Sequence, residues 1–321
     1  MTDDLTTAVS DFLNHKRALG RKYLTEEATL RLLLAFADQH RVRVLHELTP
    51  AMLNEFIGSR RRTRARSFNH LVGVIGCFLD WCVIQQRLTA SPLHRTRRRE
   101  TDQRLPFLFD TARARVLLDA AARLPDNPRA MGRGPTYHCI YALCYGLGLR
   151  AAEACTLRLG DVDADRQLVV VVGGKFGKSR LVPHGPRIGA VLGQQVARRR
   201  SAGAQDPDSP LFTFDGRRSI HPGTASQTFH HLVTALAFPV ADGVAPPHLH
   251  SLRHSFAVGC LLRWYRDGID PATRLFQLST FMGHVDPTST AVYLTVTPEL
   301  LAQANQRFES FAEPSWSQAQ P

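Results

Sequence analysis

Hydrophobic residues recur at three-and-four spacing in four successive segments of the first 90 or so residues, and the pattern then stops. This spacing places apolar side chains on one face of a helix, so it predicts helices over residues 5–19, 25–40, 49–60 and 67–86. Thr25 precedes two glutamates and Thr49 precedes Pro50, which are start signals for the second and third helices. The sequence therefore predicts a helical N-terminal domain over residues 1–94.

A basic segment without hydrophobic periodicity follows these helices, and it predicts an interdomain linker over residues 95–105. We expect its arginines to lie along a polyanion, with a plain soluble tether as the alternative; they are Arg95, Arg97, Arg98 and Arg99. A length of 321 residues with 44% hydrophobic content suits two domains with packed cores. The second domain is expected over residues 106–312, followed by a disordered tail over 313–321.

The second domain combines helical periodicity with one pair of strands. Strands predicted over 167–172 and 180–183 flank a glycine-rich turn, as in an antiparallel hairpin. A short helix is expected after Asp286 and Pro287, and the longer helices are predicted over 110–123, 135–146, 186–200, 223–237, 250–266, 272–282 and 298–311. The expected fold class is mostly α with a small antiparallel β-sheet.

The chain is strongly basic, with a formal net charge of +12. This charge favours a nucleic acid as partner, an anionic membrane surface being the usual competitor. No uninterrupted apolar run approaches the roughly 18 residues of a membrane span, and the first residues lack the order of a signal peptide. We therefore expect a cytoplasmic, nucleoid-associated protein that does not bind membranes.

An arginine-rich loop lies between the third and fourth predicted helices. It holds Arg60, Arg61, Arg62, Arg64 and Arg66. Free N–H groups at the start of the next helix, together with these charges, suit contact with DNA phosphates, the alternative being a solvated loop. The six cysteines lie in apolar stretches and are interpreted as reduced core residues. A zinc site at His138, Cys139 and Cys144 is the alternative, but its spacing is not that of a zinc module, and no metal is predicted.

Four local strings in the second domain contain residues suited to phosphate chemistry. They are Gly148-Leu149-Arg150-Ala151-Ala152-Glu153, then Gly174-Lys175-Phe176-Gly177-Lys178-Ser179-Arg180, then His250-Ser251-Leu252-Arg253-His254, then Gly283-His284 with Tyr293 nine residues after the histidine. Together these strings resemble the tyrosine recombinase, or phage-type integrase, family of site-specific DNA strand-exchange enzymes.

This resemblance implies an N-terminal helical core-binding (SAM-like) domain and an α+β catalytic domain. It implies cleavage of DNA through a 3′-phosphotyrosyl intermediate without a cofactor, by Arg150, Lys175, His250, Arg253, His284 and Tyr293. The implied partners are a double-stranded DNA recombination site, further copies forming a homotetramer on paired sites, and accessory recombination proteins. Without DNA the chain is expected to be a monomer or a weak oligomer. The long stretch from Arg253 to His284 favours a branch associated with transposon-like elements.

The residue types fit these roles. A phenol that attacks phosphorus conserves the bond energy in an ester, so resealing needs no ATP. Guanidinium groups of Arg150 and Arg253 suit the two non-bridging phosphate oxygens, and Glu153, three residues after Arg150, is placed to orient it or to form a plain surface ion pair. Lys175 suits the general acid because an ammonium can give up its proton.

Further residues have secondary or alternative roles. Lys178 is the alternative general acid and a predicted DNA contact. His250 and Arg253 project together from one helix, and the resemblance gives His250 a part in handling the tyrosine proton, whereas His254 is expected to have a packing role. The predicted helix 298–311 is expected either to dock on a neighbouring copy or to pack on its own domain.

Two other functions remain open from the sequence. One is a recombinase-like accessory protein that binds DNA without cutting it. The other is a relaxing enzyme of the type IB topoisomerase kind, which shares the chemistry and needs no pairing of sites.

Overall fold

The structure, a computed structural model, describes residues 4–94, 96–99, 104–173, 179–284, 286, 288–295, 302 and 305. The chain divides into two compact units, Met1–Gln103 and Arg104–Pro321. The division falls inside the predicted linker 95–105. The predicted tail 313–321 lies outside the described residues, as does most of the predicted helix 298–311.

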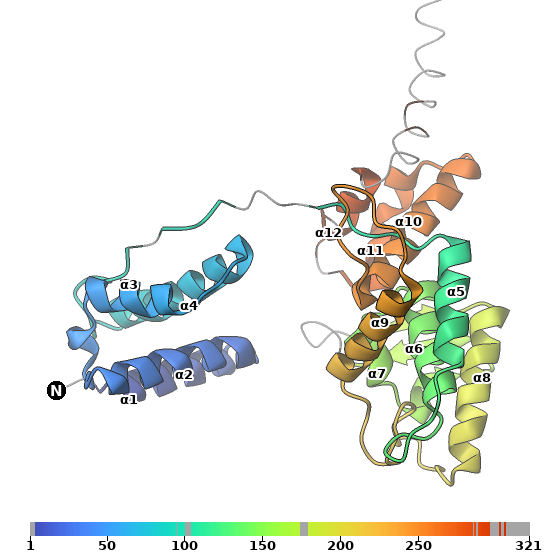
Figure 1. Ribbon diagram of the computed structural model, residues 1–321, viewed down its shortest axis with the longest axis horizontal. Helices are drawn as coiled ribbons and strands as arrows, with labels where there is room; N and C mark the ends of the chain where they lie inside the picture. Colours follow the sequence, from blue (N-terminus) through green and yellow to red (C-terminus); the bar gives the residue numbers. More distant parts are fainter. Residues whose placement is uncertain are drawn as a thin grey trace, which may run out of the picture. The chain divides into compact units, whose positions relative to one another are not determined.

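The N-terminal unit is a group of helices around one apolar core (Figure 1). Its helices are α1 (Leu5–Ala18), α2 (Leu24–Gln39), the short 3-10 turn η1 (Leu45–Glu47), α3 (Pro50–Ser59) and α4 (Ala65–Ile84). The Thr49 hydroxyl accepts a hydrogen bond from the Met52 amide and caps α3, as expected. The cap expected at Thr25 is wrong, because α2 begins at Leu24 and its N-cap is Tyr23, in a left-handed conformation without a side-chain cap.

Helix α4 has the length and mean hydropathy of a membrane span, although polar residues interrupt it and it holds no continuous apolar run of about 18 residues. Nine of its 20 residues are buried, and eight of them belong to the N-terminal core against α1 and α2. Packing within the unit therefore accounts for this hydrophobicity. Cys77 on this helix is exposed, so it is not the core residue that was expected, whereas Cys82, five residues later, is buried.

The C-terminal unit surrounds the central helix α6 (Arg133–Gly146), which contacts four other helices. Nine of its 14 residues are buried, as expected for a helix covered on most sides. The other helices are α5 (Thr111–Ala122), α7 (Ala151–Cys155), the 3-10 turn η2 (Leu159–Asp161), α8 (Pro186–Ser201), α9 (Pro222–Leu236), α10 (Leu249–Arg266), α11 (Pro271–Met282), α12 (Thr288–Ala291) and the 3-10 turn η4 (Val292–Thr295).

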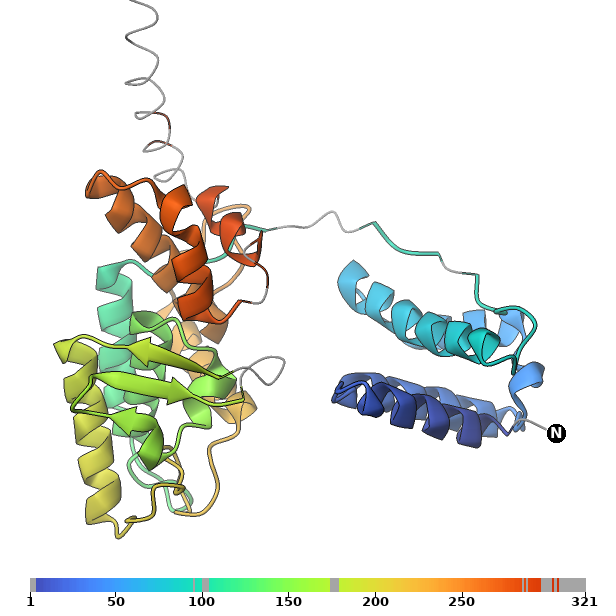
Figure 2. The ribbon, with the colours of Figure 1, turned by 180° about the vertical axis from the view of Figure 1, so that it is seen from behind.

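A three-stranded antiparallel sheet completes this unit (Figure 2). Its strands, in order, are β1 (Val162–Asp163), β2 (Leu168–Val171) and β3 (Arg180–Pro183). Val169 pairs with Val182 and both are fully buried, so one face of the hairpin joins the core. Val171 pairs with Arg180, which places the Arg180 side chain where the sheet meets α11. The predicted hairpin is confirmed, and β1 and α7 are additions that the sequence did not predict.

Candidate active site

Arg253 on α10 is the largest fully buried side chain, with 1% of its surface exposed. Its Nη1 donates to the Gly148 carbonyl and its Nη2 donates to the Met282 carbonyl at 2.7 Å. Gly148 has φ of +61°, and a Cβ there would meet the Phe256 ring at 2.4 Å, so this turn requires glycine. Burial and the Arg150 charge lower the pKa of Arg253 to about 10, which still leaves it charged at neutral pH.

Glu153 lies among three guanidinium groups. Arg150 donates to it from Nη1 at 2.6 Å and from its backbone amide at 2.9 Å, and Arg180 donates through both Nη atoms at 3.0 and 2.9 Å. The third guanidinium, of Arg253, comes within 4.0 Å. One carboxylate thus faces three permanent cations, and two positive charges remain uncompensated in a largely buried site. Such a site attracts an anion.

Three successive carbonyl groups at the end of α11 hold the same three arginines. Phe281 accepts from Arg180 Nε at 2.9 Å, Met282 accepts from Arg253, and Gly283 accepts from Arg150 Nη2 at 2.8 Å. Terminal helix carbonyls have no partner within the helix and carry partial negative charge, so they suit cations. A Cβ at Gly283 would lie 2.7 Å from Arg180 Nη1, and its φ of +67° also favours glycine. The end of α11 therefore fixes the spacing of the guanidinium groups.

Burial alone would raise the pKa of Glu153, but hydrogen bonds from Arg180 and Arg150 outweigh burial and lower the pKa to about 2. A carboxyl pKa below its unfolded value of 4.5 stabilises the fold above about pH 4.5, and this stabilisation is lost as the pH falls toward 2. We expect Glu153→Gln to lose about 3 kcal/mol of unfolding free energy at neutral pH. Urea unfolding should show that the free energy of unfolding changes less between about pH 6 and pH 2 in Glu153→Gln than in wild type. The same pH dependence in both proteins would contradict this stabilising role of the Glu153 carboxylate.

Tyr293 lies in η4 and is 4% exposed, packed with apolar residues of α10 and α11. Its hydroxyl lies 2.8 Å from His254 Nδ1. Burial raises the pKa of the Tyr293 phenol, and the charges of Arg253 and Arg150 oppose that shift. The packing role expected for His254 is therefore incomplete, because this histidine contacts the candidate nucleophile. The sequence could have indicated this contact. Residues four apart share a face of a helix, and His250 lies four positions before His254.

His250 and His284 complete the histidine set. The rings of His250 and His254 meet edge to face with centroids 4.7 Å apart, and burial together with neighbouring charges lowers the pKa of His250 to about 3. His284 Nδ1 lies 2.7 Å from the Thr290 hydroxyl, and burial followed by the Arg253 charge lowers its pKa to about 4. Asp286 accepts from the Thr288 amide and caps the turn that leads to Tyr293, as expected. With these lowered pKa values, His250 and His284 are both neutral at physiological pH.

The structure brings together Arg150, Glu153 and Arg253 in one cluster, and His250 and Tyr293 on either side of His254. Lys175 and Lys178 lie outside the described residues, as does Arg95. Sequence reasoning missed Arg180, because nothing distinguishes one arginine among many except its place directly after the lysine hairpin. In the described ranges, no group of three His, Cys, Asp or Glu side chains is arranged to hold a metal ion.

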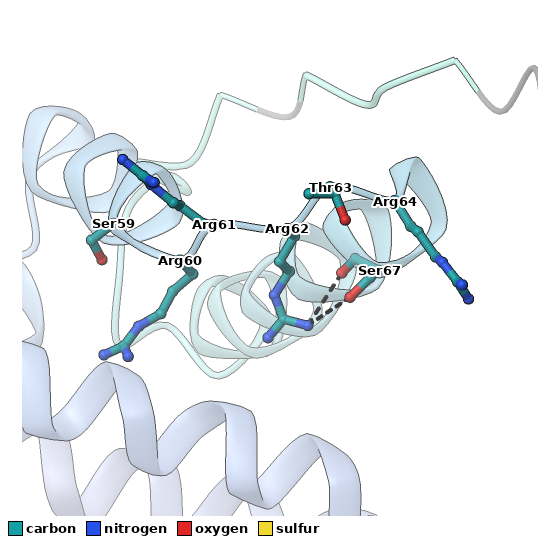
Figure 3. A pocket seen from close by; sticks show the side chains of 7 residues that line it. All are labelled: Ser59, Arg60, Arg61, Arg62, Thr63, Arg64 and Ser67. Carbon is teal, nitrogen blue, oxygen red and sulfur yellow. Dashed lines mark hydrogen bonds between the residues drawn. The ribbon is translucent and has the colours of Figure 1, made fainter. Parts of the chain in front are cut away.

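The arginine-rich loop between α3 and α4 lines an open hollow of about 510 Å³ (Figure 3). Arg60 lies over the Phe56 ring at 5.5 Å, and Arg62 turns back to donate to the Ser67 hydroxyl at 2.9 Å. Arg61 and Arg64 are exposed and project away from Ser67, and Arg66 is also exposed. The loop therefore contains two arginines held by protein contacts and three that are open to an anion.

Arg98 of the linker is fastened to the start of α4. Asn69 accepts from the Arg98 amide and donates to the Arg98 carbonyl, both at 2.8 Å. The Arg98 guanidinium stacks 3.9 Å above the Phe68 ring and donates to the Arg62 carbonyl at 2.7 Å. Arg97 and Arg99 are exposed. Contact of the linker arginines with DNA stays a prediction, and Arg98 differs from its neighbours in having these protein partners.

Comparison with known proteins identifies the family. Residues 115–299 match the model of the phage integrase family. The chain is 33% identical to the y4rB protein of Sinorhizobium fredii over 308 residues, covering 94% of this chain and 96% of that protein. It is 28% identical to tyrosine recombinase XerC of Xanthomonas campestris over 309 residues, covering 94% and 88%. The fold resembles that of the Tn1549 transposon integrase in complex with transposon right end DNA, with a TM-score of 0.64, 16% identity, and coverage of 97% and 100%. The chain belongs to the phage integrase family of tyrosine recombinases, which are site-specific enzymes that cut and rejoin DNA.

Proposed function

We propose that Tyr293 is the nucleophile with which this recombinase cuts DNA, and that Arg150 and Arg253 hold the phosphate it attacks. The observation that carries the proposal is the excess of positive charge where three guanidinium groups surround Glu153. Helix α10 supplies both Arg253 and the histidine that contacts Tyr293, so the charge and the phenol belong to one site.

The reaction conserves atoms and charge. The Tyr293 hydroxyl gives its proton to a histidine of α10 as its oxygen forms a bond to phosphorus, the bond to the 5′ oxygen breaks, and the product is a 3′-phosphotyrosyl ester. The 5′ oxygen leaves with a proton, for which Lys175 is the proposed donor; the 5′-hydroxyl of a partner strand then reverses the step. Negative charge grows on the non-bridging oxygens in the transition state, where two guanidinium groups stabilise it most. Neutral His250 and His284 are proposed to bond to the phosphate.

Tyr293 is 4% exposed, so a phosphate in a DNA duplex cannot reach its hydroxyl in the arrangement described here. The proposed reaction therefore requires the short segment 288–295 to shift when DNA binds. The segment is suited to such a shift, because α12 has four residues and the 3-10 turn η4 another four. Short elements have few internal hydrogen bonds to lose.

The N-terminal unit is proposed to grip the duplex through arginines whose side chains are exposed. From the α3–α4 loop, the start of α4 and the linker these are Arg61, Arg64, Arg66, Arg97 and Arg99; Arg98 is exposed as well, but its guanidinium contacts Phe68 and Arg62. Lys178, Arg95, Arg60 and Arg62 are proposed as further contacts, whereas Arg98 is proposed to hold the linker against α4. We propose a homotetramer on paired sites, cytoplasmic and associated with the nucleoid, with accessory proteins as further partners. Similarity in fold to a transposon integrase supports a role in moving an element.

Arginines that contact phosphates should differ from Arg98 in the salt dependence of binding. We expect Arg61→Ala or Arg64→Ala to reduce the slope of log affinity against log salt by about 0.9 each, through loss of one phosphate contact. Arg98→Ala is expected to keep the wild-type slope and to lose about 1 kcal/mol of unfolding free energy, because its contacts are with Phe68 and Arg62. Fluorescence anisotropy titrations of a DNA duplex at several salt concentrations measure this. An equal loss of slope in Arg98→Ala would assign Arg98 to the DNA.

Covalent capture tests the proposed function. Sheared genomic DNA of the source organism is incubated with the protein, and adducts that resist detergent are sequenced to locate the site. A nicked duplex of that site, from which the cleaved end diffuses away, should then accumulate adduct, and two intact sites should exchange strands. Binding without adduct would indicate an accessory protein. Adduct on any sequence, with plasmid relaxation and no exchange, would indicate a relaxing enzyme.

A further inference from the structure

Among the residues that the structure describes, His254 forms a hydrogen bond with the Tyr293 hydroxyl. Its Nδ1 lies 2.8 Å from that oxygen, and the two ring centroids are 5.4 Å apart. His250 lies one helical turn earlier, and its recorded ring contacts are with His248 and His254 rather than with the tyrosine. The histidine in contact with the phenol is therefore not the one that the resemblance assigned to its proton.

The protonation states favour donation from the phenol to the imidazole. Burial first, and then His248 and Arg253, lower the pKa of His254 to about 4, while burial raises the pKa of Tyr293. His254 is thus neutral and has one ring nitrogen with a free electron pair, and Tyr293 keeps its hydroxyl proton. In the tautomer with the imidazole proton on Nε2, the Tyr293 Oη donates to Nδ1, and this is the arrangement that the proposal uses.

We propose that His254 is the base that receives the Tyr293 proton during DNA cleavage, a proposal that rests on Tyr293 being the nucleophile. The Oη–H bond breaks and its proton moves to Nδ1 of His254. The oxygen electron pair forms the bond to phosphorus, and the 5′ oxygen departs with a proton from the general acid. His254 therefore ends the step as an imidazolium beside the new ester, and returns the proton to the phenol on resealing.

Transfer before attack would be strongly uphill, because burial raises the pKa of the Tyr293 phenol whereas burial and neighbouring charges lower the pKa of the His254 imidazole to about 4. The proton moves instead as the bond to phosphorus forms, when the phenol oxygen becomes far more acidic. A bound DNA phosphate assists, because its negative charge offsets the Arg253 charge that contributes to the low pKa of His254. His254 follows Arg253 directly on α10, so it lies beside the proposed phosphate site, and the proposal requires Tyr293 to keep its contact with His254 when segment 288–295 shifts.

Substitution by asparagine separates hydrogen bonding from proton transfer. The asparagine amide occupies the place of Nδ1 and keeps a polar contact, but it cannot take a proton at neutral pH. We expect His254→Asn to slow single-turnover cleavage of the nicked duplex by about 10² to 10⁴-fold. The loss should persist on a substrate with sulfur in place of the bridging 5′ oxygen, because a thiolate leaves without a proton and bypasses only the acid.

A more acidic nucleophile distinguishes loss of a base from loss of a structural contact, because it should restore cleavage only where a base is missing. Replacing Tyr293 by 3-fluorotyrosine lowers the phenol pKa and raises the fraction of phenolate, so it should speed His254→Asn by at least about tenfold. His250→Asn is the matched control on the same helix and should gain little. If His254→Asn folds poorly, His254→Ala with imidazole added to the buffer replaces it, with recovery of cleavage as the expected result.

Cleavage by His254→Asn at or above the wild-type rate would overturn the proposal; a faster rate would show that His254 restrains the tyrosine instead. A loss that fluorotyrosine does not relieve would overturn it too, as would the same relief in His250→Asn. Failure of the proposed function has a different signature, namely adduct formation by Tyr293→Phe. In that event the nucleophile itself is misassigned.

Discussion

Tyr293→Phe is expected to abolish the covalent protein–DNA adduct while leaving DNA binding at the wild-type level. The substitution removes one oxygen atom, and with it the only bond to phosphorus that the proposed reaction makes. Loss of a nucleophile of this kind lowers turnover by at least about 10⁴-fold. Detergent-resistant complex on the nicked duplex, measured over hours, is the assay.

The same substitution removes the hydrogen bond to His254, so a small loss of stability of about 1 kcal/mol is expected. Tyr265→Phe is a suitable control, because Tyr265 packs around the same apolar cluster as Tyr293. It should form adduct at the wild-type rate. Adduct in Tyr293→Phe, or loss of adduct in Tyr265→Phe alone, would contradict the assignment.

Arg253→Lys is expected to lose both cleavage and stability. A lysine ammonium cannot reach the Gly148 and Met282 carbonyls together as the planar guanidinium does, and it cannot present paired donors to a phosphate. Two buried carbonyls would lose a partner, at a cost of about 2–4 kcal/mol in unfolding free energy. Cleavage should fall by about 10² to 10³-fold or more, as when one stabilising donor of a transition state is removed.

Urea unfolding and single-turnover cleavage measure these two effects on one preparation. Arg158→Lys is the matched control, because the Arg158 guanidinium forms an exposed ion pair with Asp208 instead of joining the arginine cluster around Glu153. Its stability should stay within about 0.5 kcal/mol of wild type. If Arg253→Lys cleaved within about tenfold of wild type, the phosphate would not be held by Arg253.

Periodicity in the sequence predicted most helices because their apolar faces repeat over three or more turns. It could not predict α7 or β1, since five and two residues are too few to show a period. The Thr25 cap failed for a different reason. The residue before α2, Tyr23, has a left-handed backbone conformation, and no local residue pattern predicts that conformation for a tyrosine.

The spacing of the motifs was enough to propose Arg150, Arg253 and Tyr293 as site residues. The groups that contact them could be identified only from the folded structure. Arg180 reaches Glu153 because β2 and β3 pair in a register that brings Arg180, the first residue of β3, close to α11. The carbonyls of residues 281–283 align three arginines through backbone geometry, which side-chain types do not encode. The position of His254 near the site, in contrast, could have been predicted from the sequence, because His254 lies four residues after His250 and therefore on the same helix face.

The site of covalent attachment tests the central claim most directly. Trypsin should release from the trapped wild-type complex a peptide over residues 275–307, in which Tyr293 is the only tyrosine. Fragmentation by mass spectrometry is predicted to place a nucleotide, joined through its 3′-phosphate, on Tyr293. A nucleotide on any other side chain, or a linkage through a 5′-phosphate, would contradict the account.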